Sequence, residues 1–343
     1  MPFTVRSLCL KVPKGEGESV RKILLESGLL DISLKVRRVD DHILFPLLSP
    51  EVGRLGHEVL EEDFMERSVA EADFARLAHV PEQLRDLIPS SFDVIGDVAI
   101  MKLPEELLPY SKEVGGALKQ AFPRLRTIAL DKGVKGELRV RDLEVIAGDE
   151  VLETVHTEYG IKLLVDPSKV YFNPRLANEH MRVASLVHDD EVVLDMFAGV
   201  GPFAIMIARH ANPSIIYAVD LNADAISYMR RNIELNKADK VMAIEGDARE
   251  VIFDLPNVDR IVMNLPHSAM DFFPDALIKL NFGGTIHLYH ICERDDIDRV
   301  LDELLTRARG MGVMVELVRQ EELKTYSPSM SVYSLDLVLS KWC

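Results

Sequence analysis

The stretch VVLDMFAGVGPF, from Val192 to Phe203, has the residue types and spacing of a nucleotide-cofactor site. Apolar residues lead up to Asp195, as in a buried β-strand, and a turn with Gly199 and Gly201 precedes residues typical of a helix. Because glycine has no side chain, the backbone of such a turn can approach a ligand closely. The stretch therefore predicts a nucleotide cofactor at the junction of a strand and a helix.

The residues of this turn favour a cofactor with positive charge. The third glycine of the dinucleotide pattern GxGxxG is absent, and Pro202 stands where the helix begins. Asp195 places a carboxylate at the end of the strand, where it would repel a diphosphate. The same carboxylate would attract the amino group and sulfonium of S-adenosylmethionine, so we expect this cofactor.

Polar residues follow three further predicted strands. Ile215 to Val219 is followed by Asp220, which is placed to accept hydrogen bonds from ribose hydroxyls. The next strand leads to Asp247, a candidate acceptor for the adenine amino group, and the last leads to Asn264. Because ligands bind at the carboxyl ends of strands in open α/β sheets, these strand ends, together with Asp195, indicate one shared site.

The motifs at these strand ends resemble those of one known family. LDMFAGVGPF, VDLN at Asp220, EGDARE at Asp247 and MNLPH at Asn264 are similar to motifs of class I methyltransferases that use S-adenosylmethionine. With YFNPRLANEH (171–180) and GELRVRDLEVIAG (136–148), they resemble the archaeal and eukaryotic tRNA (guanine-37-N1) methyltransferase family. The resemblance covers most of the chain and implies methyl transfer to N1 of guanosine 37 in tRNA. It assigns cofactor contacts to Asp195, Phe197, Gly199, Gly201, Asp220, Asn222, Asp247, Asn264 and Arg175.

Methyl transfer to guanine N1 needs a base that takes the N1 proton and a group that stabilises negative charge on O6. Glu179 matches the family glutamate assigned as the base, and burial would have to raise its pKa toward neutrality for this role. Without the resemblance, Glu179 is interpreted as a carboxylate favoured by a helix N-terminus. Arg139 matches the family arginine that stabilises charge on O6, and its neighbour Arg141 is an open alternative.

The remaining catalytic residues are also implied by the resemblance. Asn264 and Pro266, in NLPH, resemble the motif by which amino-group methyltransferases hold a planar nitrogen near the methyl donor. Tyr171 matches a family tyrosine beside cofactor and target. No metal is expected, because His287 and His290 alternate on a predicted strand and point to opposite faces.

Length and charge set limits on the partners of this chain. Its 343 residues allow two or three domains, and its formal net charge of −16 is unusual for a protein that binds nucleic acid. However, Lys119 to Arg141 contains seven basic and two acidic residues, which predicts a local positive face. We expect a monomer that binds the anticodon loop and outer body of tRNA.

Other features predict a cytoplasmic protein that does not bind membranes. The sequence has no apolar run long enough to span a bilayer and no export signal at its start. Its cysteines, Cys9, Cys292 and Cys343, are far apart, which argues against a disulfide framework or a zinc site.

The elements indicate three domains. Residues 1–68 are predicted as a small α/β domain that the resemblance assigns to tRNA recognition, whereas composition alone fits a role in stability or dimerisation equally well. Residues 69–165 are predicted as a middle, RNA-binding α/β domain. Residues 166–343 are predicted as the catalytic domain, a doubly wound, Rossmann-like sheet with one antiparallel edge strand. The expected segments are strand 7–12, helix 18–27, a hairpin of 35–39 and 42–46, linker 51–72, a strand pair in 92–103, helix 104–121, strands 128–130 and 137–143, a hairpin of 162–165 and 170–172, and helix 175–187.

Three other functions are compatible with parts of this pattern. A related wyosine-pathway enzyme transfers the aminocarboxypropyl group of the same cofactor, and the intact NLPH and the amino-terminal domain favour methyl transfer over it. The chain could also bind tRNA without catalysis. A dehydrogenase is disfavoured by the missing third glycine and by the predicted edge hairpin.

Overall fold

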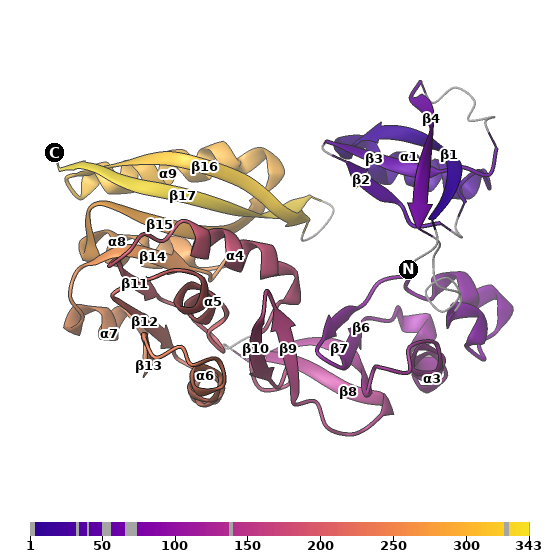
Figure 1. Ribbon diagram of the computed structural model, residues 1–343, viewed down its shortest axis with the longest axis horizontal. Coiled ribbons are helices and arrows are strands. Elements are labelled where there is room, and N and C mark those ends of the chain that lie inside the picture. Colours follow the sequence, from indigo (N-terminus) through magenta and orange to yellow (C-terminus); the bar gives the residue numbers. More distant parts are fainter. Residues whose placement is uncertain are drawn as a thin grey trace. The chain divides into compact units, whose positions relative to one another are not determined.

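The computed structural model describes residues 4–31, 34–39, 41–49, 56–65, 74–136, 140–325 and 329–342 (Figure 1). The chain forms two compact units. The first comprises Met1–Ser90, Leu103–Ile128 and Ile146–Gly148, and the second Ser91–Lys102, Ala129–Val145 and Asp149–Cys343.

An antiparallel sheet near the N-terminus has the order β2-β3-β1-β4. Helix α1 packs against it through Val20 and Leu24, which share a core with Leu10 and Phe45. The predicted first strand, helix and hairpin are confirmed. The elements are β1 (Thr4–Pro13), α1 (Gly17–Glu26), β2 (Arg37–Val39), β3 (His42–Pro46) and β4 (Glu58–Met65).

The predicted linker at 51–72 is wrong for Glu58–Met65, which form strand β4. The acid-rich run pairs with β1, where Glu58 lies near Lys11 and Glu61 near Arg6 at ion-pair distances of 3.5 and 3.4 Å. Phe64 is buried on the core side. Pairing with a neighbouring strand therefore outweighs the low β-propensity of glutamate.

A second sheet, in order β5-β6-β7-β8, follows the first along the chain. The predicted strand pair about Gly96 is confirmed, and Gly96 has a positive φ of 56°. The predicted helix 104–121 begins as a 3-10 helix that contains Pro109. The elements are η2 (Glu82–Leu87), β5 (Asp93–Ile95), β6 (Val98–Met101), η3 (Glu105–Tyr110), α3 (Ser111–Ala121), β7 (Thr127–Lys135) and β8 (Val140–Gly148).

Strand β10 (Ile161–Val165) pairs with β9 (Thr154–Glu158) and not with 170–172 as predicted. Residues 170–172 are not in a strand, although Val170 and Phe172 are buried. Their apolar side chains are buried in the core, but their backbone does not pair with another strand. The apolar pattern of the sequence is the same in both cases and cannot distinguish them.

The seven-stranded sheet of the second unit has the order β13-β12-β11-β14-β15-β17-β16. Strands β11 to β15 run parallel, and β17 runs antiparallel to both β15 and β16. The predicted fold class is confirmed, although the antiparallel strand lies next to the edge rather than at it. The strands are β11 (Val192–Asp195), β12 (Ile215–Asp220), β13 (Val241–Glu245), β14 (Val258–Met263), β15 (Leu280–Glu293), β16 (Val313–Thr325) and β17 (Met330–Trp342).

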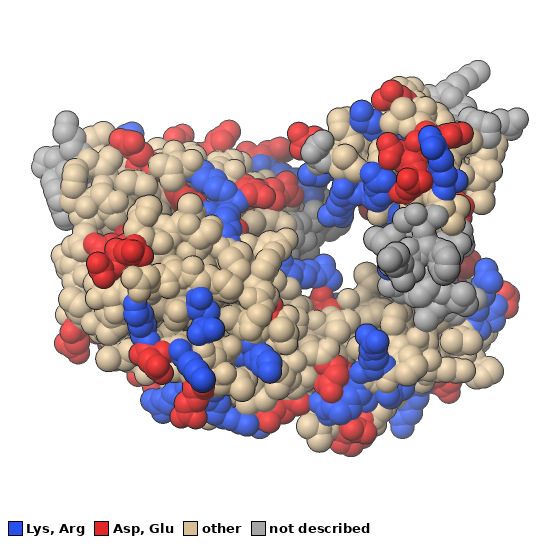
Figure 2. Space-filling model, viewed as in Figure 1, with Lys and Arg blue, Asp and Glu red and all other residues tan. Residues whose placement is uncertain are grey.

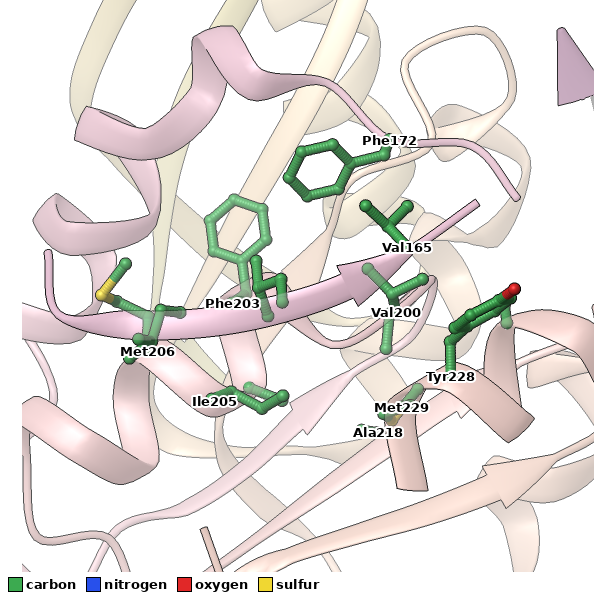
Figure 3. Packing of buried hydrophobic residues seen from close by; sticks show 14 of the residues in the cluster. Val165, Phe172, Val200, Phe203, Ile205, Met206, Ala218, Tyr228 and Met229 are labelled. Atoms are coloured by element: carbon green, nitrogen blue, oxygen red, sulfur yellow. The ribbon is translucent and has the colours of Figure 1, made fainter. Parts of the chain in front are cut away.

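Helices cover both faces of this sheet, as expected for a doubly wound fold. Neighbouring strand residues alternate between two cores: Val193 packs with α4, α5 and α6, and Leu194 packs with α7, α8 and α9. Figure 3 shows Phe172 and Phe203 packed together in the first core. The helices are η4 (Pro174–Leu176), α4 (Ala177–Ser185), α5 (Pro202–His210), α6 (Ala223–Asn236), α7 (Ala248–Asp254), α8 (Ala269–Lys279), η5 (Arg294–Asp296) and α9 (Ile297–Gly310).

Candidate active site

A pocket of about 480 Å³ lies at the carboxyl ends of β11, β12, β13 and β14, and the described residues that line it all belong to the second unit. Strand order reverses here, since β12 and β14 flank β11 on opposite sides. Open α/β sheets bind ligands at such a switch point. Many of the predicted site residues line this pocket: Tyr171, Phe197, Gly199, Asp220, Asn222, Asp247, Asn264 and Pro266.

The predicted glycine turn connects β11 to α5. Gly201, at the N-cap of α5, has a φ of 87°, and a Cβ there would lie 2.9 Å from Met229 Cγ. Gly199 has a φ of 55°, and its N–H donates to Asp220 Oδ2 at 2.6 Å. Both positions therefore require glycine, Gly201 for space and both for backbone conformation.

Asp220 lies at the end of β12 and lines the pocket. Burial raises the pKa of its carboxyl group, and the backbone N–H groups of Asn222 and Gly199 oppose this rise. Each carboxylate oxygen accepts one of these N–H groups and retains a second lone pair for a ligand hydroxyl. This geometry fits the predicted contact with ribose.

Asn222 and Asp247 also line the pocket, but their side chains cap helices. Asn222 accepts from the N–H of Asp224 at 3.0 Å and donates to the Lys169 carbonyl at 3.0 Å. Asp247 accepts from the N–H of Arg249 at 2.8 Å at the start of α7. Both side chains therefore fix the loops that surround a cofactor, and Asp247 keeps one carboxylate oxygen for an adenine amino group.

Asp195 is fully buried, and within the described residues neither of its carboxylate oxygens has a hydrogen-bond partner. Burial raises its pKa to about 8; the backbone N–H of Phe197 opposes this rise, and the nearby Asp220 carboxylate adds to it. The next residues, Met196 and Phe197, line the pocket, whereas Asp195 does not. An unpaired buried carboxylate behind the pocket wall fits a cationic ligand such as a sulfonium.

An aromatic wall of Phe197, which was predicted, and Phe272, which was not, borders the pocket. Phe197 meets Phe272 edge-on, with 4.9 Å between ring centroids, and the Arg249 guanidinium lies 4.2 Å from the Phe272 centroid. Phe272 belongs to α8, whose apolar pattern gives no signal that this side chain faces a ligand. Such a wall suits the flat ring of a nucleoside.

The loop after β14 forms another side of the pocket. The Pro266 carbonyl accepts from the N–H of Ile291 at 3.0 Å, which attaches this loop to β15. Within the described part of the chain, the Asn264 side chain makes no hydrogen bond, so its amide can receive a ligand. Tyr171 lines the pocket with 45% of its surface exposed.

A charged cluster contains two of the arginines considered in the sequence analysis. Arg175 donates to Asp93 Oδ1 from Nε at 2.9 Å and is not among the described residues that line the pocket, and its cofactor contact stays a prediction. Arg141 lines the pocket and contacts Asp93 at 3.0 Å and Asp131 at 3.6 Å. Burial raises the pKa of Asp93, but the two arginines outweigh it and lower the pKa overall. Arg139 lies outside the described residues.

Glu179 is buried on α4 and does not line the pocket. Arg182 binds its carboxylate through two nitrogens, at 2.8 and 2.7 Å, and the hydroxyls of Tyr289 and Ser334 donate at 2.8 and 2.9 Å. Burial raises the Glu179 pKa, but these donors outweigh it and lower the pKa overall. The expectation of a raised pKa is therefore wrong, because burial brings Glu179 a cation and two hydroxyl donors.

The Glu179–Arg182 pair begins a buried polar row between α4 and the sheet. Arg182 also binds Asp336, and Asp336 accepts from His287 Nδ1 at 2.7 Å. His287 Nε2 faces Arg260 at 2.8 Å and must accept, because arginine has only donors. Burial lowers the His287 pKa, so the ring is neutral at physiological pH. The sequence pattern did not predict this row of buried polar side chains, because the segments of β14, β15 and β17 are mostly apolar.

The predicted positive face between Lys119 and Arg141 is partly neutralised. Lys132 pairs with Glu144 at 2.5 Å, and Lys135 pairs with Asp142 at 2.6 Å. Figure 2 shows basic and acidic side chains interspersed on the face that it draws. Acidic side chains of β8 therefore reduce the local excess of positive charge that the residue count along 119–141 suggested.

The described residues contain no group of three or more metal-ligating side chains, and His287 serves the polar row instead. Within the same residues, no helix is both long and apolar enough to cross a membrane. Cys9 and Cys292 are buried free thiols.

Family models match three consecutive parts of the chain. The model described as the TRM5/TYW2 methyltransferase domain matches residues 154–316, the TYW2 N-terminal domain matches 76–151, and the tRNA methyltransferase 5 N-terminal domain matches 9–53. The tRNA (guanine(37)-N(1))-methyltransferase Trm5b of Pyrococcus abyssi is 40% identical over 337 residues, 97% of this chain and 99% of that protein. A tRNA(Phe) (4-demethylwyosine(37)-C(7)) aminocarboxypropyltransferase of Pyrococcus horikoshii is 31% identical over 76% of this chain and 94% of its own length.

Solved structures are also similar to this chain over nearly its whole length. The crystal structure of P. abyssi Trm5b has a TM-score of 0.73 and 39% identity, and covers 98% of this chain and 100% of its own. The complex of aTrm5 with tRNALeu has a TM-score of 0.70 at 32% identity, covering 97% and 100%. Methanocaldococcus jannaschii Trm5 in complex with adenosine has a TM-score of 0.69 at 32% identity, covering 97% and 99%.

Proposed function

The chain belongs to the TRM5/TYW2 methyltransferase family, and we propose that it transfers a methyl group from S-adenosylmethionine to N1 of guanosine 37 in tRNA. The observation that carries this proposal is the pocket at the switch point of the sheet, which brings Asp220 and Asp247 together with Asn264 and Pro266. Similarity to Trm5b over nearly the whole chain supports the choice of nucleotide.

The cofactor side of the pocket holds a nucleoside by its polar edges. Asp220 accepts from the ribose hydroxyls, Asp247 accepts from the adenine amino group, and the wall of Phe197 and Phe272 contacts the ring. A cation bound near Asp195 would lower the raised pKa of this carboxyl group and so favour its ionised form. When bound, S-adenosylmethionine supplies an electrophilic methyl group and its own leaving group.

The target side orients guanine and removes its proton. Asn264 and Pro266 hold the N1 edge beside the methyl donor, and Tyr171 contacts the base. Glu179 receives the N1 proton, and Arg139 stabilises charge on O6. Arg141, which lines the pocket, is the alternative to Arg139 for this contact. The target base is turned out of the anticodon loop to reach them.

The domain division completes the proposal. Residues 1–68 contact the outer body of tRNA, 69–165 contact the RNA near the target, and 166–343 carry out the transfer. The three family matches fall within or close to these bounds, which supports the division. A monomeric state and a cytoplasmic location stay predictions.

Aminocarboxypropyl transfer is a second candidate. The similarity to the P. horikoshii transferase favours it, because the same cofactor fold serves both reactions. The two reactions add groups of very different mass to the nucleoside. The relatives with full-length similarity are methyltransferases, which supports methyl transfer.

The first prediction concerns the modified nucleoside and the role of Glu179 as the catalytic base. Purified protein with labelled S-adenosylmethionine and unmodified tRNA should give 1-methylguanosine at position 37, identified by mass analysis of the mapped nucleoside. Glu179→Gln should lower the single-turnover rate by about 100-fold or more, because the acceptor of the N1 proton is lost.

Cofactor affinity, measured by calorimetry, should survive in Glu179→Gln and serves as the control for folding. A product carrying the aminocarboxypropyl group would replace the proposal by the second candidate. No product at all would point to tRNA binding without catalysis. Unchanged methylation by Glu179→Gln would remove Glu179 from the mechanism.

A further inference from the structure

Tyr289 is the described pocket-lining residue that also hydrogen-bonds to Glu179. Its hydroxyl donates to Glu179 Oε1 at 2.8 Å, whereas Arg182 and Ser334, the other partners of this carboxylate, do not line the pocket. Glu179 does not line it either. Tyr289 therefore connects the wall of the pocket with the buried Glu179 carboxylate.

We propose that Tyr289 relays the N1 proton of guanine to Glu179, an inference that rests on the proposed function. The N1–H bond breaks as a new O–H bond forms at Tyr289 Oη, and the original Tyr289 proton moves to Glu179 Oε1. The electron pair left on N1 forms the bond to the methyl carbon. The pair of the broken carbon–sulfur bond stays with the sulfur of the departing thioether.

The surroundings of Tyr289 suit a relay in which both protons move together. The side chain is fully buried, and its ring lies 5.6 Å from the Phe203 ring, centroid to centroid. Burial and the neighbouring Glu179 carboxylate raise its pKa well above the usual value, so a free phenolate does not accumulate. The bond to Glu179 already has the orientation that transfer needs.

The polar row makes temporary protonation of Glu179 tolerable. Arg182 binds two carboxylates, with Nη1 at 2.6 Å from Asp336 Oδ2 and Nη2 at 3.1 Å from Asp336 Oδ1. When Glu179 becomes neutral, Arg182 keeps Asp336 as its counter-ion. The Arg182 guanidinium therefore stays paired, and the high cost of a buried cation without a counter-ion is avoided.

The test compares two tyrosines that differ in their relation to the pocket. Tyr289→Phe removes the relay hydroxyl and keeps the ring. Tyr228→Phe is the matched control, since Tyr228 is also buried and its hydroxyl donates to a carboxylate, Glu153, at 2.8 Å, away from the pocket lining. We expect Tyr289→Phe to lower the single-turnover rate by about 100-fold with unchanged affinity for S-adenosylmethionine and tRNA. Tyr228→Phe should methylate at the wild-type rate.

A proton inventory on the wild-type enzyme tests the relay without any variant. Single-turnover rates in mixtures of H₂O and D₂O should depend quadratically on the deuterium fraction, because two protons move in one step. A linear dependence, a near-normal rate of Tyr289→Phe, or a loss confined to cofactor affinity would each overturn the relay. A slow Glu179→Gln beside a fast Tyr289→Phe would leave Glu179 as the base and refute only the relay. Failure of the wild type to methylate position 37 would refute the proposed function itself.

Discussion

At the scale of single residues, the site depends on how burial and charge act on each carboxylate. The Asp195 carboxylate is buried with no hydrogen-bond partner of ordinary geometry among the described residues, and its pKa rises to about 8. Glu179 is buried with Arg182 beside it, and its pKa falls. Burial alone therefore does not decide the protonation of a carboxylate, because the donors that accompany it can reverse the shift.

Asp195→Asn tests the unpaired carboxylate. Because the folded-state pKa of Asp195 is raised, the unfolded chain releases this proton at lower pH, and the wild type loses stability as pH rises from about 4 to about 8. The free energy of unfolding of the variant should therefore exceed that of the wild type by a margin that grows by roughly 1 kcal/mol per pH unit in this interval.

The measurement is urea unfolding of both proteins without cofactor at several pH values from 5 to 9. Above pH 8 the margin should stay constant. A margin that does not change with pH would mean that Asp195 is ionised throughout, and the account of its burial would be incorrect.

At the scale of elements, side chains of helix α6 hydrogen-bond to the backbone of β10, as a neighbouring strand would. Asn232 Oδ1 accepts from the N–H of Leu164 at 2.7 Å, and its Nδ2 donates to the Leu164 carbonyl at 3.0 Å and to the Val200 carbonyl at 3.1 Å. Asn236, one turn later, binds both backbone groups of Lys162 in the same way. Backbone N–H and C=O groups at the free edge of this two-stranded hairpin thereby find hydrogen-bond partners on a helix.

Asn232→Leu should lower the free energy of unfolding by about 3 kcal/mol, because an N–H and two carbonyl groups lose their buried partners. Arg230→Leu, at an exposed position on the same helix, is the control and should change it by about 0.5 kcal/mol or less. Chemical unfolding gives both values. Equal effects of the two variants would show that the asparagine bonds add nothing.

At the scale of the whole molecule, the pocket and the amino-terminal sheet are built independently. Every described residue that lines the pocket belongs to the second unit. The described residues that form the cores of the amino-terminal sheet lie between positions 8 and 64. Removal of this sheet therefore takes no described side chain from the pocket or from the cores of the catalytic sheet.

Deletion of residues 1–68 should leave the affinity for S-adenosylmethionine unchanged, because the cofactor side of the pocket is intact. The KM for tRNA should rise by roughly tenfold or more, equivalent to about 1.4 kcal/mol of binding free energy, if these residues contact the outer body of tRNA. Calorimetry and steady-state kinetics measure the two quantities. An unchanged KM for tRNA would exclude the proposed contact.

The sequence alone predicted the catalytic sheet and most of the cofactor side of the pocket. Asp220, Asp247 and Asn264 each lie at or within two residues of the end of a strand, so the rule that parallel strands end at one edge suffices to bring them together. The glycine turn at Gly199 and Gly201 is likewise determined by residues next to one another. These features depend on local sequence and on a general property of the fold.

Only the tertiary structure decided the partners of the buried polar groups. Tyr289 and Glu179 are 110 positions apart, and the Arg182–Asp336 pair spans 154 positions. Strand β4 and the pairing of β10 with β9 also depend on which segments become neighbours. No local pattern encodes such contacts, because they arise when helix α4 and the sheet pack together and each buried charge must find a counter-ion or a donor.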